Sequence, residues 1–184
     1  MDSNTTDQLF DSATTTLTQL TQTIHGLDAS TYTRDSSALP GSTIGKHVRH
    51  ILDHFNLLFH ALSSNASTDS GCNADTMSVN YAQRIRNVST ESDVQAGLEA
   101  IRQAVACAEG LRKQGVEAGE AIEVVDVMSS GSEVALMSTV GRELWFCVHH
   151  MVHHNAVIAQ LFFEFGLAPS LKAAYAPSTL KASK

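Results

Sequence analysis

The sequence predicts an all-α protein of four long helices, with a short β-hairpin before the last helix. Four segments repeat apolar residues at steps of three and four, the spacing that places side chains on one helical face. The expected helices span 6–25, 42–62, 90–114 and 139–165. Between the last two segments the helical period fails and β-branched residues gather instead. With 184 residues and 43% hydrophobic residues, the chain suits a single domain, 1–184, with one core.

The first two helices are joined by a polar connection. The connection, 28–41, contains Pro40 and several serines and threonines, and Ser42 is the expected N-cap of the second helix. The first helix carries its apolar stripe on Leu9, Ala13, Leu17, Leu20 and Ile24. The second carries its stripe on Ile44, Val48, Ile51, Leu52, Phe55, Leu58, Phe59 and Leu62.

The third helix is expected to begin at Ser89 or Thr90 and to stop at Gly115. Before it, the segment 81–87 is predicted to be a turn or a strand-like piece. The inward-facing residues of the helix are Val94, Leu98, Ile101, Val105, Ala108 and Leu111.

The hairpin and the last helix follow. Residues 122–128 and 134–137 are the two predicted strands, and the serine- and glycine-containing segment 129–132 is their turn. Ser138 or Thr139 then caps the fourth helix, which Gly166 closes, and the tail 167–184 is expected to be irregular.

Composition excludes several classes of function. The net charge is −7 and no basic run occurs, which argues against nucleic acid as a partner. No apolar stretch approaches the ~20 residues that span a bilayer, and the polar, acidic N-terminus is unlike a secretory signal. The three cysteines are odd in number and lack CxxC spacing, so we expect reduced thiols and a cytoplasmic location.

Histidines are concentrated in two short windows. Seven of the nine histidines lie in His47-Val-Arg-His50-Ile-Leu-Asp-His54 and His149-His150-Met-Val-His153-His154. Histidine is the commonest side-chain metal ligand, and a pair at i, i+4 projects from one helical face. A third histidine from another helix would complete a three-nitrogen site with an open position for water or substrate. We therefore predict a metal site; the alternative is that these are surface or hydrogen-bonded core histidines.

The helical wheel separates the histidines of the fourth helix. At 100 degrees per residue, about 3.6 residues per turn, His150 and His154 fall on the flank of the apolar stripe. His149 and His153 fall on the polar side and should face solvent. On the second helix, geometry leaves His47, His50 and His54 all possible as ligands.

Other side chains are candidates for a surrounding site. Glu143 lies in line with His150 and could accept a proton or orient a ligand, and Asp53 could do the same. The alternative for both is an ordinary surface carboxylate. Arg84 and Arg86 could anchor a carboxylated substrate, unless they pair with nearby acidic residues, and Tyr81 could supply a hydroxyl or simply pack.

At these residues the chain resembles the DinB/YfiT-like family of metalloenzymes. The matching pieces are Ser42-Thr-Ile-Gly-Lys-His-Val-Arg-His50-Ile-Leu-Asp53-His54 and Arg142-Glu-Leu with His150-Met-Val-His153-His154-Asn-Ala. The expected helix order and hairpin also fit, so the resemblance covers most of the chain. His154 is followed by Asn-Ala where many members have Arg-Gly or a similar pair.

The resemblance implies a DinB-like four-helix bundle, frequently a homodimer, in which three histidines hold a divalent metal. His50, His150 and His154 match the family's ligands. Zinc is the first expectation for the metal, with nickel, iron or manganese as alternatives. Some relatives are S-transferases or isomerases that use a low-molecular-weight thiol, and many have no known reaction.

The leading functional prediction is therefore a metal-dependent enzyme of the thiol S-transferase type that acts on a small-molecule substrate. Three neutral imidazoles would leave the metal its full charge, so that a thiol at the open position would lose its proton near neutral pH. Metal-assisted hydrolysis is the alternative within enzymes. A non-catalytic metal-binding or scaffold protein is the alternative outside them.

Overall fold

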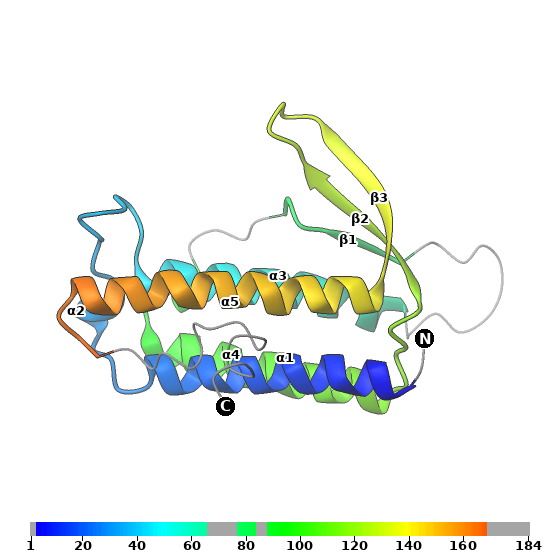
Figure 1. Cartoon of the computed structure of the whole chain (residues 1–184), viewed down its shortest axis with the longest axis horizontal. Helices are drawn as coiled ribbons and strands as arrows, with labels where there is room; N and C mark the ends of the chain where they lie inside the picture. Colours follow the sequence, from blue (N-terminus) through cyan, green and yellow to red (C-terminus); the bar gives the residue numbers. More distant parts are fainter. Residues whose placement is uncertain (1–2, 66–76, 84–87, 169–184) are drawn as a thin grey trace, which may run out of the picture.

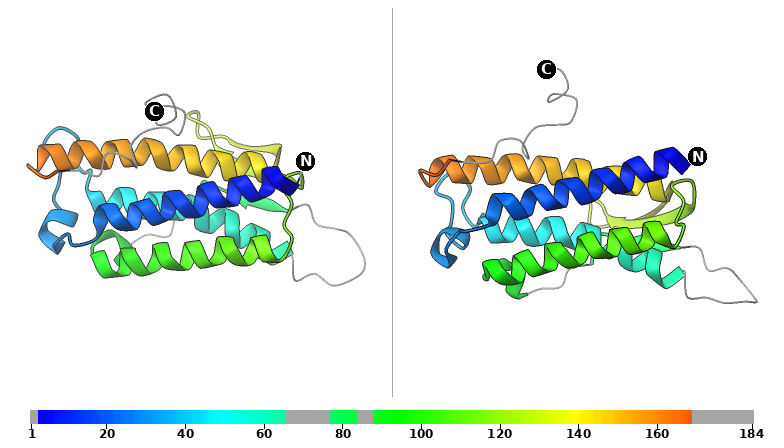
Figure 2. Two further views of the ribbon diagram at one scale, coloured as in Figure 1. Left: turned by 60° about the horizontal axis from the view of Figure 1, so that its bottom comes forward. Right: turned by 90° about the horizontal axis from the view of Figure 1, so that it is seen from below.

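Four long helices lie side by side along the molecule in the computed structural model, which describes residues 3–65, 77–83 and 88–168 (Figure 1). They are α1 (Ser3–Ile24), α3 (Ile44–Asn65), α4 (Val94–Lys113) and α5 (Val140–Glu164). Both α1 and α3 pack chiefly against α4 and α5, so each long helix has two long-helix neighbours (Figure 2). The predicted helical class is confirmed, together with a small β-sheet.

The apolar stripes form the core between these helices. All eight residues of the stripe predicted for the second helix are buried on α3. On α1, Phe10 is buried and Leu9 only partly so, which moves the stripe by one position. On α4, Gly97 and Ala104 are buried, whereas Leu98 and Val105 are only partly buried. Periodicity therefore located each buried face correctly and misjudged some of its borders.

Two helices begin later than the sequence predicts. Thr43, and not Ser42, caps α3: the Lys46 amide donates to Thr43 Oγ1 at 3.1 Å. Asp93 caps α4 by accepting from the amides of Gln95 and Ala96, and residues Ser89–Glu91 form a separate 3-10 turn, η1. A carboxylate satisfies the free amides of a first turn, so α4 starts after Asp93.

The first helix begins three residues earlier than predicted, at Ser3, and α3 ends three residues later, at Asn65, whereas the remaining boundaries agree within one residue. Thr139 caps α5 through the Arg142 amide. Gly115 and Gly166, just beyond the C-terminal ends of α4 and α5, both have positive φ, a conformation that glycine adopts without strain. Of the predicted tail, only residues 167 and 168 belong to the described part of the chain, and they are not in a helix or strand.

The predicted connection 28–41 contains a short helix, α2 (Ala29–Tyr32), capped by Asp28. Tyr32 is fully buried, and its hydroxyl donates to the Thr90 carbonyl at 2.8 Å. Gly45 and Gly97 leave room for the Tyr32 ring, because a Cβ at either position would meet it. The two glycines thus allow α2 and η1 to close one end of the helical core.

A three-stranded sheet stands beside α3 and α5 (Figure 1). The predicted hairpin is confirmed as β2 (Ala121–Val127) and β3 (Glu133–Thr139). A third strand, β1 (Ser78–Asn80), pairs parallel to β2, giving the order β1-β2-β3. Tyr81 begins the turn after β1, as predicted for the start of segment 81–87, whereas the strand itself precedes the predicted segment. Residues 84–87 fall outside the described part.

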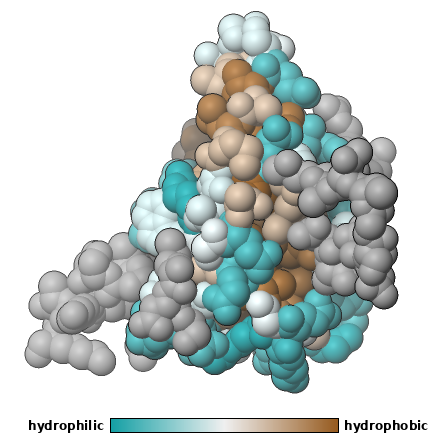
Figure 3. Space-filling view, turned by 90° about the vertical axis from the view of Figure 1, so that its right-hand side faces the viewer, coloured by the Kyte–Doolittle hydropathy of each residue, from teal (hydrophilic) through white to brown (hydrophobic). Residues whose placement is uncertain are grey.

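The hairpin carries exposed apolar side chains. Figure 3 shows them gathered where the hairpin projects from the helices. The largest are Val127, Met128, Leu136 and Met137, of which Leu136 is 65% and Met137 63% exposed. The base of the hairpin is anchored, because Ile122 is fully buried in the core.

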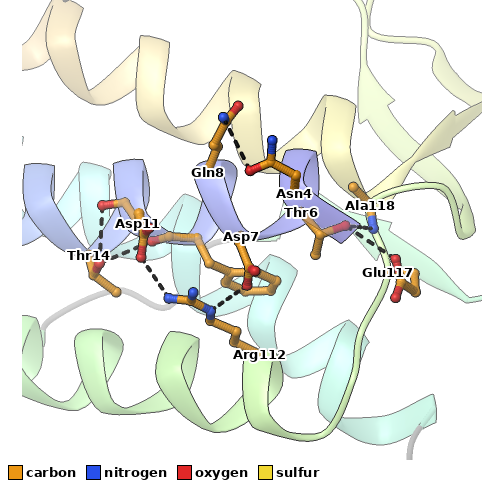
Figure 4. Close-up of polar contacts among 10 residues, drawn as sticks. Asn4, Thr6, Asp7, Gln8, Asp11, Thr14, Arg112, Glu117 and Ala118 are labelled. Carbon is orange, nitrogen blue, oxygen red and sulfur yellow. Dashed lines mark hydrogen bonds and ion pairs between the residues drawn. The ribbon is translucent and has the colours of Figure 1, made fainter. Parts of the chain in front are cut away.

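Polar contacts tie α1 to α4 and to the loop after it (Figure 4). Arg112 reaches Asp7 at 2.7 Å and Asp11 at 2.6 Å, and the Ala118 amide donates to Thr6 Oγ1 at 3.0 Å. Arg112 is exposed, so its ion pairs orient the two helices but contribute little stability. None of the helices in the described part is both long and apolar enough to cross a membrane.

Candidate metal centre

The two histidine windows face each other across the α3–α5 contact. His150 and His154 are partly buried, whereas His149 and His153 are exposed, as the helical wheel predicts. The packing of α5 against α3 brings His150 and His154 to the partly buried histidines of α3, His47, His50 and His54. Five imidazoles therefore form one cluster, hereafter the histidine cluster.

The spacing of the ring nitrogens suits metal coordination. His50 Nε2 lies 2.9 Å from His150 Nε2, which lies 3.2 Å from His154 Nε2. Two nitrogens bound to one tetrahedral zinc ion at ~2.0–2.1 Å lie about 3.3 Å apart. Ligand atoms of His50, His54 and His150 all lie within 4.8 Å of one another. The donor set fits zinc or nickel, since imidazole suits both metals.

His54 and His47 support the cluster from opposite sides. His54 Nδ1 faces the His50 carbonyl oxygen at 3.0 Å. A carbonyl only accepts, so His54 Nδ1 carries the proton and its Nε2 is left as a ligand atom. His47 Nδ1 lies 2.8 Å from His154 Nδ1, and its Nε2 lies 2.7 Å from Ser42 Oγ. His47 thus connects His154 to the N-terminal end of α3.

Three imidazoles of the cluster, those of His47, His150 and His154, are neutral at pH 7. Burial, followed by the positive charges that neighbouring histidines would carry, lowers the pKa of His150 to about 4 and of His154 to about 3. Burial also lowers the pKa of His47. Metal ions bind the neutral ring, so these nitrogens need not lose a proton first.

Pockets open on two sides of the histidine cluster, and His50 lines both. The first, hereafter the acidic pocket, has a volume of about 290 Å³. It is lined by His50, Asp53, His54, Leu57, Tyr81, Gln83, Asp126, Phe146 and His150. The second, hereafter the basic pocket, has a volume of about 470 Å³. Its lining residues are Leu39, Pro40, Gly41, Ser42, Lys46, His47, Arg49, His50 and His154.

Tyr81 forms one wall of the acidic pocket. Its ring stacks on His54, with centroids 5.3 Å apart, and its hydroxyl lies 3.7 Å from Cys147 Sγ. Burial, Cys147 and Glu143 together raise the pKa of Tyr81, so its hydroxyl stays protonated. Tyr81 therefore presents a neutral ring to the pocket and holds its hydroxyl among buried polar groups.

The predicted carboxylates occupy different places. Asp53 lines the acidic pocket, 3.8 Å from Arg49 Nε. Glu143 is only 5% exposed and lines neither pocket; its Oε1 accepts from Ser138 Oγ at 2.6 Å. Glu143 also interacts with the Tyr81 side chain, and its contact with Ser138 joins β3 to α5. Arg84 and Arg86 lie outside the described residues.

Sequence reasoning did not single out Asp126, Lys46 or Arg49 as lining residues. Asp126 enters the acidic pocket from β2, and nothing in the local pattern of the hairpin shows how close it stands to α3. Lys46 and Arg49 each directly precede a histidine of α3, His47 and His50. This adjacency was the sequence signal that could have placed them near the histidine cluster.

Comparisons with known proteins give one partial similarity. No family model and no solved structure matches the chain. Over 103 residues it is 31% identical to FK506-binding protein 5 of Rhizopus delemar. The matched region is 56% of this chain and only 27% of that protein, so the chain spans about a quarter of its relative's length.

Proposed function

We propose that this chain is a divalent-metal-binding protein of the DinB-like type and that it catalyses thiol S-transfer. The observation that carries the proposal is the histidine cluster, in which imidazoles from α3 and α5 converge beside two pockets. The order of four long helices with a hairpin before the last one supports the DinB-like assignment. Zinc is the proposed metal.

The proposed ligands are the Nε2 atoms of His50, His150 and His154. The Nε2 atom of His150 lies 2.9 Å from that of His50 and 3.2 Å from that of His154, and these two separations support this set. His47 would orient His154 through their 2.8 Å contact, because a hydrogen bond to the second ring nitrogen fixes a ligand's tautomer. His54 offers its own Nε2 from the side of the acidic pocket and is the alternative third ligand.

The chemistry follows from the groups around the acidic pocket. A divalent metal held there would supply positive charge that lowers the pKa of a nearby thiol. Asp53 and Asp126 line the same pocket, and Asp126 is exposed to solvent. In our proposal Asp126 accepts the thiol proton, the sulfur forms a bond to an electrophilic carbon of the substrate, and the leaving group departs with the electron pair. Phe146 and Tyr81 line the same pocket, and in our proposal their rings exclude water from one side of the reacting atoms.

Metal content tests the ligand set directly. Elemental analysis of purified protein should find about one divalent ion per chain, and His50→Ala, His150→Ala and His154→Ala should each lose it. His149→Ala and His153→Ala are matched controls on the exposed side of α5 and should keep it. If His54→Ala loses the metal and His154→Ala keeps it, then His54 and not His154 is the third ligand. Equal loss in every variant would contradict the site.

The reaction class needs a separate test. Metal-loaded and chelator-treated protein would be incubated with a panel of electrophiles, with and without a low-molecular-weight thiol. Conjugation that requires both thiol and metal supports S-transfer. Consumption of a substrate without thiol would favour metal-dependent hydrolysis, and no turnover in a metal-loaded protein would favour a binding or scaffold role.

A further inference from the structure

The basic pocket differs in charge from the rest of the molecule. Its charged lining residues are Lys46 and Arg49, and no carboxylate among the described residues lines it. The chain as a whole has a net charge of −7. The acidic pocket, on the other side of His50, is lined by Asp53 and Asp126. The two pockets beside the histidine cluster therefore differ in the charge of their lining residues.

Several guanidinium donors of Arg49 have only long contacts or no hydrogen-bond acceptor within the described residues. Its side chain is only 16% exposed, and its buried Nε has no hydrogen-bond partner in the described part of the chain. Its two carboxylate neighbours are Glu91 at 3.4 Å and Asp53 at 3.8 Å. Charge-assisted hydrogen bonds between such groups are about 2.7–2.9 Å long, so these contacts leave the guanidinium donors poorly used. An anion in the pocket could accept from its Nη groups.

Lys46 adds a second cation at the pocket wall. Its Nζ donates to the neutral Gly41 carbonyl at 2.8 Å, and no carboxylate of the described residues lies within 4.0 Å of it. An ammonium group has three donors, so two remain for a ligand. Gly41 and Ser42 also place the pocket at the N-terminal end of α3, where the helix dipole favours negative charge.

The pocket adjoins the histidine cluster. His47, His50 and His154 form part of its lining, so a molecule held by Lys46 and Arg49 would lie beside their imidazole rings. A volume of about 470 Å³ is within the range of small-molecule sites.

We propose that the basic pocket binds the carboxylate or phosphate group of a small molecule whose remainder reaches the histidine cluster. The prediction that an anion binds here depends only on the residues of the basic pocket. The further claim that this anion is a substrate rests on the proposed function. The substrate class is thereby narrowed to organic anions.

Anion binding can be measured on the intact chain without any turnover. Succinate and inorganic phosphate would be titrated separately into chelator-treated and zinc-loaded protein, and amide NMR signals of Ser42, Lys46 and His47 followed. We expect saturable shifts at these residues, and the stronger of the two probes identifies the anion type. Lys46→Gln should weaken Kd about fivefold or more, the effect of losing one charge-assisted hydrogen bond. Lys46→Arg should largely retain binding.

The control is Lys113→Gln, which removes the same charge from an exposed position on α4. It should leave Kd unchanged. The proposal is overturned if shifts do not saturate, if they map to the acidic pocket, or if the Gln variants at 46 and 113 weaken binding equally. Metal content measured on the zinc-loaded samples separates the two ideas: protein that takes up no zinc but still binds the anion refutes the metal site alone.

Discussion

Cys147 illustrates how burial decides the chemistry of a single residue. Its side chain is buried, and this burial raises the pKa of its thiol to about 12. The thiolate is the reactive form of cysteine, so Cys147 should be inert although it lies beside Tyr81 and near the histidine cluster. Cys147 is therefore unsuited to act as the sulfur nucleophile, and in the proposed reaction the sulfur comes from a bound thiol.

Alkylation measures this inertness. In native protein, iodoacetamide should modify the half-buried Cys107 at least about tenfold faster than Cys147, because the Cys147 thiol is buried and its raised pKa suppresses the thiolate. Both should react after denaturation. Peptide mass spectrometry gives the two rates, and comparable rates in the native state would show that Cys147 is accessible and ionised.

The histidine cluster predicts a pH dependence of stability. The pKa values of His150 and His154, about 4 and about 3, lie below the value of about 6.5 for an unfolded chain. Below about pH 6.5 the unfolded chain therefore binds more protons than the folded chain. The free energy of unfolding consequently decreases as the pH is lowered. Stability contributed by the neutral rings is complete above about pH 6.5 and is lost toward about pH 4.

Urea denaturation of chelator-treated protein at pH 7 and pH 5 tests this sign. We expect a lower midpoint at pH 5, and a smaller difference for His154→Phe, whereas the exposed control His153→Phe should behave like the parent. A midpoint that rises on acidification would mean that the folded cluster prefers the protonated rings.

The sequence predicts the orientation of some site residues but not of others. The side to which His150 and His154 point follows from their spacing relative to the apolar residues of the same helix. The roles of His47 and His54 do not, because both border the apolar face and their contacts depend on how α3 is rotated against α5. Asp126 was missed because it reaches the acidic pocket only through the placement of β2.

At the scale of elements, the close approach of α2, α3 and η1 depends on glycine. A Cβ on Gly45 would meet the Glu91 carbonyl oxygen and the Tyr32 ring, and neither group can move without disturbing the core. Gly45→Ala should therefore lower the free energy of unfolding by about 1–3 kcal/mol. Chemical denaturation measures the loss.

Gly110 provides the matched control on α4. A Cβ there meets nothing within 4 Å, and alanine favours the helix by about 0.5–1 kcal/mol, so Gly110→Ala should stabilise the protein. If both substitutions stabilise it, then the packing around Gly45 is looser than described.

Elements defined by local periodicity were the ones the sequence could predict. The complete apolar stripe of α3 and the hairpin β2–β3 are examples. In contrast, β1 has only three residues and exists because it pairs with β2, more than forty positions away in sequence. Helix α2 is a single turn capped by Asp28, too short for a periodic signal. The N-cap of α4 is Asp93 and not the predicted Ser89 or Thr90, because the Asp93 carboxylate accepts from two amides of the first turn.

At the scale of the whole molecule, the arrangement of helices creates the site. Windows about one hundred residues apart meet because α3 and α5 are neighbours (Figure 1). Asp126 of β2 and Tyr81, in the turn after β1, line the acidic pocket from the side of the sheet. The histidine cluster then separates a pocket lined by aspartates from one lined by Lys46 and Arg49. The sequence could predict which residues face inward, but the two pockets and their opposite charges required the packing of the helices.

X-ray absorption at the zinc edge of zinc-loaded protein tests the central claim most directly. We expect a first shell of about three imidazole nitrogens at ~2.0–2.1 Å, with the outer-shell scattering of imidazole rings, and loss of that pattern in His150→Ala. A shell of sulfur or of oxygen alone, or a spectrum unchanged by His150→Ala, would contradict a metal centre in the histidine cluster.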